Sequence, residues 1–277
     1  MPHPRKRFGQ HWLKDAAIHQ AIVQAAQLSP TTTVLEIGPG TGQLTRRLLA
    51  QGSRVIGVEI DRDLCQGLRR QFAAEPRFEL IEGDFLHLPL PPTPTHVVAN
   101  IPYNITGPIL AKLLGSLSQP VGQFQRLVLL LQKEVAERLT ASPGQKSYGA
   151  LSVRIQYLAA CQWICLVPPQ AFYPPPQVHS AVLALQPRPY PHPPRDPRWL
   201  ETLVTLGFRS RRKTLANSLQ SLIPKDQLSQ ALAQLGRDPF TRGEALSVAE
   251  WVSLSDMLLD LRASLLGARR HDGGIGE

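Results

Sequence analysis

The chain has 277 residues, of which 43% are hydrophobic, enough for one sizeable core and a second, smaller domain. Its formal net charge of +9 indicates an anionic partner, because Lys and Arg gain free energy by releasing counterions from phosphates. No run approaches the roughly 18 apolar residues of a membrane span, and residues 1–15 lack the apolar core of a secretory signal. We therefore expect a cytoplasmic protein without a membrane partner.

Local sequence patterns in the first half of the chain predict an α/β fold. Asp15 is placed to cap a short amphipathic helix that ends near Pro30. Apolar, β-rich runs then alternate with helical patterns, which predicts a parallel sheet covered by helices. The runs expected to be strands are 34–37, 54–60, 78–81, 97–101 and 126–131.

The second half of the chain changes character. Residues 151–167 are rich in β-branched and aromatic residues, residues 178–185 alternate, and the proline-rich stretch 187–197 predicts an extended linker. Helical apolar spacing follows over 199–208, 215–222, 228–235 and 248–266. We predict a sheet domain over 1–186, a linker over 187–197, an all-helical domain over 198–267 and a disordered tail over 268–277.

A glycine-rich turn follows the first predicted strand, in residues 36–42 (EIGPGTG), and a helical pattern comes directly after it. Glycines lack a Cβ, so a ligand can lie against such a turn. The next strand ends at Glu59, which can accept hydrogen bonds from ribose hydroxyls, and the third leads into Asp84, which can accept from an adenine amine. Both acids are expected at the edge of the sheet formed by the carboxyl ends of its strands.

The charge of these acids distinguishes between adenosine cofactors. Glu59 and Asp84 would repel a pyrophosphate but suit a cationic sulfonium, and the GxGxxG spacing of dinucleotide sites is absent. The sequence therefore predicts S-adenosylmethionine. Cys65, Cys161 and Cys165 form no CxxC pair and have no nearby His at zinc-ligand spacing, so neither a disulfide framework nor a metal site is expected.

The fourth predicted strand runs into Asn100-Ile101-Pro102-Tyr103-Asn104. An exocyclic adenine amine is a poor nucleophile, and hydrogen-bond acceptors at its two protons favour the geometry that attacks a methyl group. The Asn100 side-chain oxygen and the carbonyl of Ile101 or Pro102 can supply them, while Pro102 stiffens the turn. Tyr103 can stack on a flipped base, and Phe172 is our candidate for a second aromatic wall.

With these residues in place, the sequence closely resembles the ribosomal RNA adenine dimethyltransferases that modify two adjacent adenines near the 3′ end of bacterial 16S RNA. The resemblance spans nearly the whole chain and rests on residues 6–10, 36–42, 100–104, 131–135, 172–178 and 211–215. It implies a seven-stranded, Rossmann-like methyltransferase sheet with an antiparallel last strand, a C-terminal helical domain and a role in small-subunit biogenesis. The cofactor contacts that it implies are His11, Leu13, Gly38, Glu59, Asp84 and Asn100.

One position departs from the family pattern. Asn is common where this chain has His11, which leaves open whether His11 contacts the cofactor through its side chain or its backbone. We expect a monomer whose partner is 16S rRNA within the 30S subunit or its precursor. Basic residues expected to contact phosphates are Arg5, Lys6, Arg7, Arg209, Arg211, Arg212 and Lys213.

Two alternatives remain at this point. An enzyme of the macrolide-resistance type methylates an adenine in 23S rRNA with the same catalytic pattern, although residues 133–135, 172–178 and 211–215 look more like the small-subunit group. A ribosome-assembly factor that binds without catalysis would keep the fold but not need both acids, the glycine turn and Asn100.

Overall fold

A computed structural model describes Arg5 and residues 9–271, which form two compact units. The first comprises Met1–Gly115, Val121–Thr140 and Ala159–Arg188, and the second comprises Ser116–Pro120, Ala141–Leu158 and Pro189–Glu277. Each unit is therefore made of three separate segments of the chain, whereas the prediction placed each domain in one continuous segment, with boundaries near residues 186 and 198. Within the described residues, no helix has the length and apolar composition that a bilayer-spanning segment requires.

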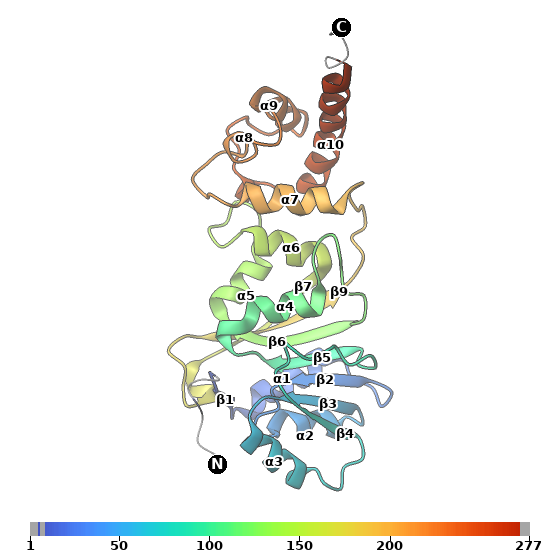
Figure 1. The fold of residues 1–277 in the computed structure, drawn as a ribbon. Helices are drawn as coiled ribbons and strands as arrows, with labels where there is room; N and C mark the ends of the chain where they lie inside the picture. The colour runs from blue at the N-terminus through green and yellow to red at the C-terminus, as the bar shows by residue number, and fades with distance from the viewer. Residues whose placement is uncertain (1–4, 6–8, 272–277) are drawn as a thin grey trace. The chain divides into compact units, whose positions relative to one another are not determined.

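The first unit is built on a seven-stranded sheet in the order β4-β3-β2-β5-β6-β9-β7 (Figure 1). The first five of these strands are parallel, and β9 runs antiparallel to both its neighbours. All five strands predicted from the first half of the chain are confirmed, with ends that differ by at most one residue. The strands are β2 (Thr33–Ile37), β3 (Arg54–Glu59), β4 (Phe78–Glu82), β5 (His96–Asn100), β6 (Arg126–Gln132), β7 (Ala159–Val167) and β9 (Ser180–Pro187).

Successive residues of a strand point to opposite faces of the sheet, and here the residues on both faces are apolar. Helices therefore cover the sheet. Val34, Val55 and Val98 join one core cluster with residues of the first two helices, while their neighbours Leu35, Ile56 and Val97 are equally buried. Asp15 caps the first helix through its side chain, as predicted. The helices are α1 (Ala16–Ala26), α2 (Gln43–Ala50), α3 (Arg62–Gln71), α4 (Thr106–Leu114) and α5 (Lys133–Thr140).

A second, two-stranded sheet joins the start of the chain to a distant loop. Strand β1 (Trp12–Leu13) pairs antiparallel with β8 (Phe172–Tyr173), which follows the short helix η3 (Pro169–Ala171). The amide of Lys14 continues this link by donating to the Ala171 carbonyl at 2.8 Å. This pairing ties the N-terminal segment to the loop that precedes β9.

The second unit is helical and packs around Trp251, which is fully buried. Gly207 lies against the Trp251 ring, and the Tyr148 hydroxyl donates to the Leu246 carbonyl at 2.9 Å. Its elements are α6 (Ala150–Leu158), α7 (Pro197–Gly207), α8 (Leu215–Ser218), α9 (Lys225–Gln234), η4 (Gly243–Ala245) and α10 (Val248–His271).

The structure refines three elements of the second half of the chain. The run 151–167, which is rich in β-branched and aromatic residues, divides into two elements: residues 150–158 form α6, in which Val153 and Ile155 are buried, and only 159–167 are extended. The helix expected over 215–222 stops at Ser218. Helix α10 continues through His271, so residues 268–271 of the expected tail are helical, and the rest of that tail lies outside the described residues.

Candidate active site

A cavity of about 260 Å³ opens at the carboxyl ends of β2, β3 and β5. Its walls come from the turns after these strands, from residues 83–86 beyond β4 and from residues 9–12 of the N-terminal segment. The carboxyl edge of a parallel sheet is where open α/β folds bind ligands. The predicted residues His11, Gly38, Glu59, Asp84, Asn100, Pro102 and Tyr103 all line this cavity.

The glycine turn forms the floor. Gly38 and Gly40 have φ values of 69° and 59°, which glycine adopts without strain. The Gly38 amide donates to the Val58 carbonyl at 2.9 Å, and a Cβ on Gly38 would meet no atom within 4 Å. A ligand can therefore approach the backbone of this turn directly.

Glu59 is the central acid of the cavity wall and is only 4% exposed. Its Oε1 accepts from the amides of Ile60 and Asp61, each at 3.0 Å, and its Oε2 accepts from the Gly40 amide at 3.0 Å. Burial raises the pKa of Glu59, although these three backbone donors oppose the shift. Because a carboxylate oxygen accepts more than one hydrogen bond, Oε2 retains capacity for a ligand hydroxyl.

Asp84 lies at the rim, with its side chain 35% exposed. Its Oδ1 accepts from the Leu86 amide at 2.9 Å, and its Oδ2 contacts His87 Nδ1 at 2.9 Å. None of the cavity-lining residues, all within the described chain, is Lys or Arg. These carboxylate acceptors suit the cationic S-adenosylmethionine, and the lining offers no cation to neutralise a pyrophosphate.

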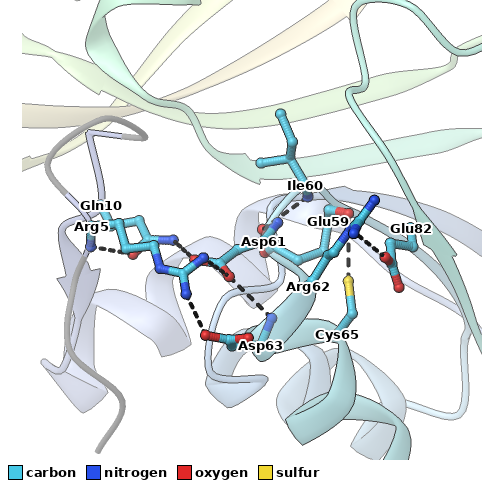
Figure 2. Close-up of polar contacts among 9 residues, drawn as sticks. All are labelled: Arg5, Gln10, Glu59, Ile60, Asp61, Arg62, Asp63, Cys65 and Glu82. Carbon is cyan, nitrogen blue, oxygen red and sulfur yellow. Dashed lines mark hydrogen bonds and ion pairs between the residues drawn. The ribbon is translucent and has the colours of Figure 1, made fainter.

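Ion pairs of Arg5 with Asp61 and Asp63, here called the ionic latch, link the N-terminal segment to the residues that follow β3 (Figure 2). The Arg5 guanidinium pairs with Asp61 Oδ1 at 3.0 Å and also with Asp63, while Gln10 Nε2 donates to Asp61 Oδ2 at 3.1 Å. Asp61 is 3% exposed and follows Glu59 by two residues. Arg5 was predicted to contact RNA, but in this structure both its terminal nitrogens are engaged by carboxylates.

Asn100 ends β5 and connects it to the N-terminal segment. Its Nδ2 donates to the His11 carbonyl at 2.9 Å, and no described residue donates to its Oδ1. The Ile101 amide donates to the Leu130 carbonyl at 3.1 Å, and the Pro102 carbonyl accepts from the Ile105 amide at 3.2 Å. The sequence analysis offered the carbonyls of Ile101 and Pro102 as backbone acceptors for the target amine. The Pro102 carbonyl already accepts a hydrogen bond, so the Ile101 carbonyl is the better placed of the two to accept one from a ligand.

Tyr103 begins η2 (Tyr103–Ile105) and is held at both ends. Its hydroxyl lies 2.7 Å from Ser180 Oγ, and its ring stacks on the His11 imidazole with centroids 6.0 Å apart. Burial raises the pKa of Tyr103. His11 Nδ1 in turn lies 2.7 Å from the Pro174 carbonyl, so the His11 side chain positions neighbouring groups rather than pointing freely into the cavity.

Phe172 is placed differently from the prediction of an open aromatic wall, while the cofactor contact expected of Leu13 stays a prediction. Phe172 is 1% exposed and packs in the core with Leu13, because the β1–β8 pairing turns both side chains inward. Phe172 does not line the cavity, so it is not an open aromatic wall opposite Tyr103 in this structure. Leu13 is 6% exposed and borders only a smaller hollow of about 40 Å³ behind the glycine turn.

Apart from Arg5, the predicted RNA contacts fall into three groups. Lys6 and Arg7 lie outside the described residues. Arg211 pairs with Glu244 at 3.5 Å and donates to the Lys146 and Tyr148 carbonyls, so it holds together parts of the helical unit. Arg209, Arg212 and Lys213 are exposed.

Sequence reasoning gave no role to three residues of the site. Asp61 anchors the ionic latch, and its position two residues after Glu59 at a helix start was an available signal. Trp12 packs its indole 3.4 Å from the position of a Cβ on Gly40. Glu36 is fully buried behind the turn, where Thr45 Oγ1 donates to it at 2.6 Å and burial raises its pKa to about 8.

Comparison with known proteins bears on this geometry. The profile of the family described as "Ribosomal RNA adenine dimethylase" matches residues 1–260. The ribosomal RNA small subunit methyltransferase A of Synechococcus sp. (strain JA-3-3Ab) is 63% identical over 264 residues, which cover 94% of this chain and 95% of the relative. Its counterpart in Thermosynechococcus vestitus (strain NIES-2133 / IAM M-273 / BP-1) is 58% identical over 262 residues, covering 93% and 98%.

Two solved structures are similar to this chain over most of its length. A dimethyladenosine transferase from Plasmodium falciparum superimposes with a TM-score of 0.73 at 26% identity, covering 88% of this chain and 96% of that chain. The 23S rRNA methyltransferase ErmE gives a TM-score of 0.75 at 28% identity, covering 89% and 99%. The backbone alone therefore does not separate the two kinds of RNA substrate.

Proposed function

Because the chain belongs to the ribosomal RNA adenine dimethylase family, whose profile spans residues 1–260, we propose that it dimethylates N6 of two adjacent adenines in 16S rRNA. The substrate is the hairpin near the 3′ end within the 30S subunit or its precursor, and the methyl donor is S-adenosylmethionine. The enzyme acts in the cytoplasm as a monomer and contributes to small-subunit biogenesis. The 63% identity to a small-subunit enzyme over 94% of the chain carries the choice of substrate.

The cavity residues have complementary tasks in this reaction. Glu59 Oε2 accepts from a ribose hydroxyl, Asp84 accepts from the cofactor adenine amine, and the backbone at Gly38 leaves room for the chain that carries the sulfonium. S-adenosylmethionine supplies the electrophilic methyl group. Among the described residues that line the cavity there is no Lys or Arg, so no cationic side chain of that lining repels the positive sulfonium.

Asn100 and Ile101 orient the nucleophile. Asn100 Oδ1 and the Ile101 carbonyl accept from the two amine protons of the target adenine, which directs the nitrogen lone pair towards the methyl group. Tyr103, fixed by Ser180 and His11, stacks on the base. The alkylated amine is strongly acidic and loses its proton to water, so no side chain of the site has to serve as a strong base.

The likeness to ErmE defines the competing substrate, an adenine of 23S rRNA. The experiment is to incubate the protein and S-adenosylmethionine with unmethylated 30S subunits and, separately, with 50S subunits or free 23S RNA. Nucleoside mass spectrometry then measures dimethyladenosine. Product in 30S RNA alone is expected; product confined to 23S RNA would overturn the substrate assignment, and RNA binding without product would indicate a binding factor.

A further inference from the structure

A second polar cavity lies at the opposite edge of the main sheet from the candidate active site. It has a volume of about 450 Å³ and is bordered by the residues that begin β5 and β6 and by the turn before β2. The two edges are about 13 Å apart along β5, at roughly 3.3 Å for each step from His96 to Asn100. The cofactor and the target base therefore do not account for this cavity.

Arg126 supplies the positive charge of the second cavity. Its Nε donates to the Ala25 carbonyl at the end of α1, and no described carboxylate pairs with its terminal nitrogens. The guanidinium is only partly exposed, and burial lowers its pKa. A partly buried guanidinium without an acid beside it has unused capacity for an anion, since an Arg fork matches two oxygens at once.

His96 lies beside Arg126 on the neighbouring strand, and the charge of Arg126 affects the pKa of His96. Its Nδ1 lies 3.0 Å from Thr95 Oγ1, and its Nε2 has no partner among the described residues. Burial is the larger cause that lowers the pKa of His96, and the positive charge of Arg126 is the smaller one. The imidazole is therefore neutral at pH 7 and adds a hydrogen-bonding nitrogen without adding a second charge.

Neutral side chains complete the lining. Ser29 and Thr31 contribute hydroxyls that lie 3.0 Å apart at the lip. Three side-chain amides, from Gln27, Gln125 and Gln186, also border the cavity, and all three residues are exposed. None of the lining residues, each within the described chain, carries a carboxylate.

We propose that this cavity binds a phosphate group, which Arg126 contacts through its terminal nitrogens while hydroxyls and amides around it donate to the remaining oxygens. One guanidinium with Ser, Thr and Gln donors is the set that proteins direct at nucleic-acid phosphates. The same chemistry fits a backbone phosphate of RNA and a free phosphate-bearing molecule. These two sources are separated by the test.

The first arm of the test uses inorganic phosphate. The full-length protein is titrated with phosphate while chloride keeps the ionic strength constant, and backbone amide NMR shifts are followed. Saturable shifts confined to residues 27–32, 95–96, 125–126 and 186 are expected. Arg126→Gln should weaken phosphate binding at least about tenfold, the loss of one charge-assisted pair of hydrogen bonds, and the exposed Arg46→Gln on α2 should leave it unchanged.

Arg126 also binds the end of α1, so its loss could disturb folding. Thr31→Val keeps that contact and should weaken phosphate binding by a smaller, measurable factor of about three. Shifts that do not saturate, shifts spread over the surface, or equal affinities for wild type, Arg126→Gln and Thr31→Val would overturn the proposal. The map of shifts in the wild-type protein decides this even if one variant does not fold.

The second arm identifies the source of the phosphate. If the group belongs to RNA, Arg126→Gln and free phosphate should each lower the affinity for unmethylated 30S subunits, whereas Arg46→Gln should not. If subunit affinity is unchanged while phosphate binding is lost, the ligand is a free phosphate-bearing molecule. Methylation of 30S RNA by the wild-type protein tests the proposed activity without reference to this cavity, so failure of the phosphate proposal is separable from failure of that activity.

Discussion

The Asn100 side chain donates through Nδ2 to the main-chain carbonyl of His11 at 2.9 Å, which links the end of β5 to the N-terminal segment. This bond assigns the amide nitrogen to His11 and therefore leaves Oδ1 as the acceptor for the target amine. Asn100 thus combines a structural contact with the role proposed for it in methyl transfer.

Asn100→Ala should lower the single-turnover methylation rate by about 10²–10³-fold, the usual effect of losing one aligned polar group at a reacting centre. Affinity for unmethylated 30S subunits should remain, since the exposed basic residues of the helical unit are untouched. Rapid-quench methylation and subunit binding measure the two quantities, and thermal unfolding checks the fold. Loss of subunit binding in a folded variant would show that recognition and catalysis are not separable here.

The latch between Arg5 and Asp61 predicts an effect on cofactor affinity. Arg5→Gln removes the ion pairs with Asp61 and Asp63 next to the segment whose Gln10 and His11 line the cavity, so the dissociation constant for S-adenosylhomocysteine should rise about fivefold, or about 1 kcal/mol. Calorimetric titration measures it. Arg62→Gln is the matched control, because Arg62 pairs with Glu82 with its side chain 86% exposed. Equal affinities for the two variants would argue against the latch.

The sequence predicted the carboxyl edge of the sheet well because that part of the site follows local patterns. Strand periodicity placed Glu59 and Asn100 at strand ends, and parallel strands bring such ends together. The acids, the glycine turn and Asn100 therefore meet in one cavity, as expected.

The errors concern contacts between distant segments. Phe172 is buried because residues 12–13 pair with residues 172–173, and nothing in either segment alone specifies this pairing. The RNA contact expected of Arg5 stays a prediction, but local patterns gave no sign of its ion pairs, because Asp61 and Asp63 lie 56 and 58 residues away in sequence. Residues 150–158 form a helix although their composition favours a strand, because tertiary packing overrides weak propensity.

Glu36 predicts a pH dependence of stability. Burial raises its pKa to about 8 in the folded protein, whereas the unfolded chain has the ordinary value near 4.5. Between these values the folded protein holds a proton that the unfolded chain has released. The stabilisation from Glu36 is therefore complete below about pH 4.5 and is lost as the pH rises through about 8.

Glu36→Gln removes this titration while keeping an acceptor for Thr45. Relative to wild type, its free energy of unfolding should rise by up to about 1.4 kcal/mol per pH unit between pH 5 and about 8. Urea unfolding at several pH values measures the difference in free energy of unfolding between the variant and wild type. Glu59 titrates in both proteins, so its contribution to the pH dependence largely cancels in this difference. Glu79→Gln, on the exposed side of β4, should run parallel to wild type, and a parallel curve for Glu36→Gln would refute the assignment.

The basic segment 209–213 should divide into structural and recognition residues. Arg211→Glu breaks contacts to Glu244 and to two carbonyls, so it should lower the melting temperature. The double variant Arg212→Glu/Lys213→Glu should leave the melting temperature and cofactor affinity unchanged but weaken 30S binding and reduce its salt dependence by about two units of slope. Unchanged subunit binding in the double variant would exclude this segment from the RNA interface.

Gly57 tests whether the glycine turn depends on the strand beneath it. A Cβ at Gly57 would lie 2.7 Å from Pro39 Cγ, between Gly38 and Gly40, and would push the turn into the cavity. Gly57→Ala should therefore cost about 1–3 kcal/mol of stability and weaken S-adenosylhomocysteine binding in the same variant. Gly67→Ala is the matched control: its Cβ would meet no atom within 4 Å, and it lies inside α3. That variant should gain up to about 1 kcal/mol with unchanged affinity, because Ala is the better helix former. If Gly57→Ala lost stability but bound the cofactor normally, the position of the turn would not depend on β3, and cofactor affinity would have to come mainly from Glu59, Asp84 and the N-terminal segment.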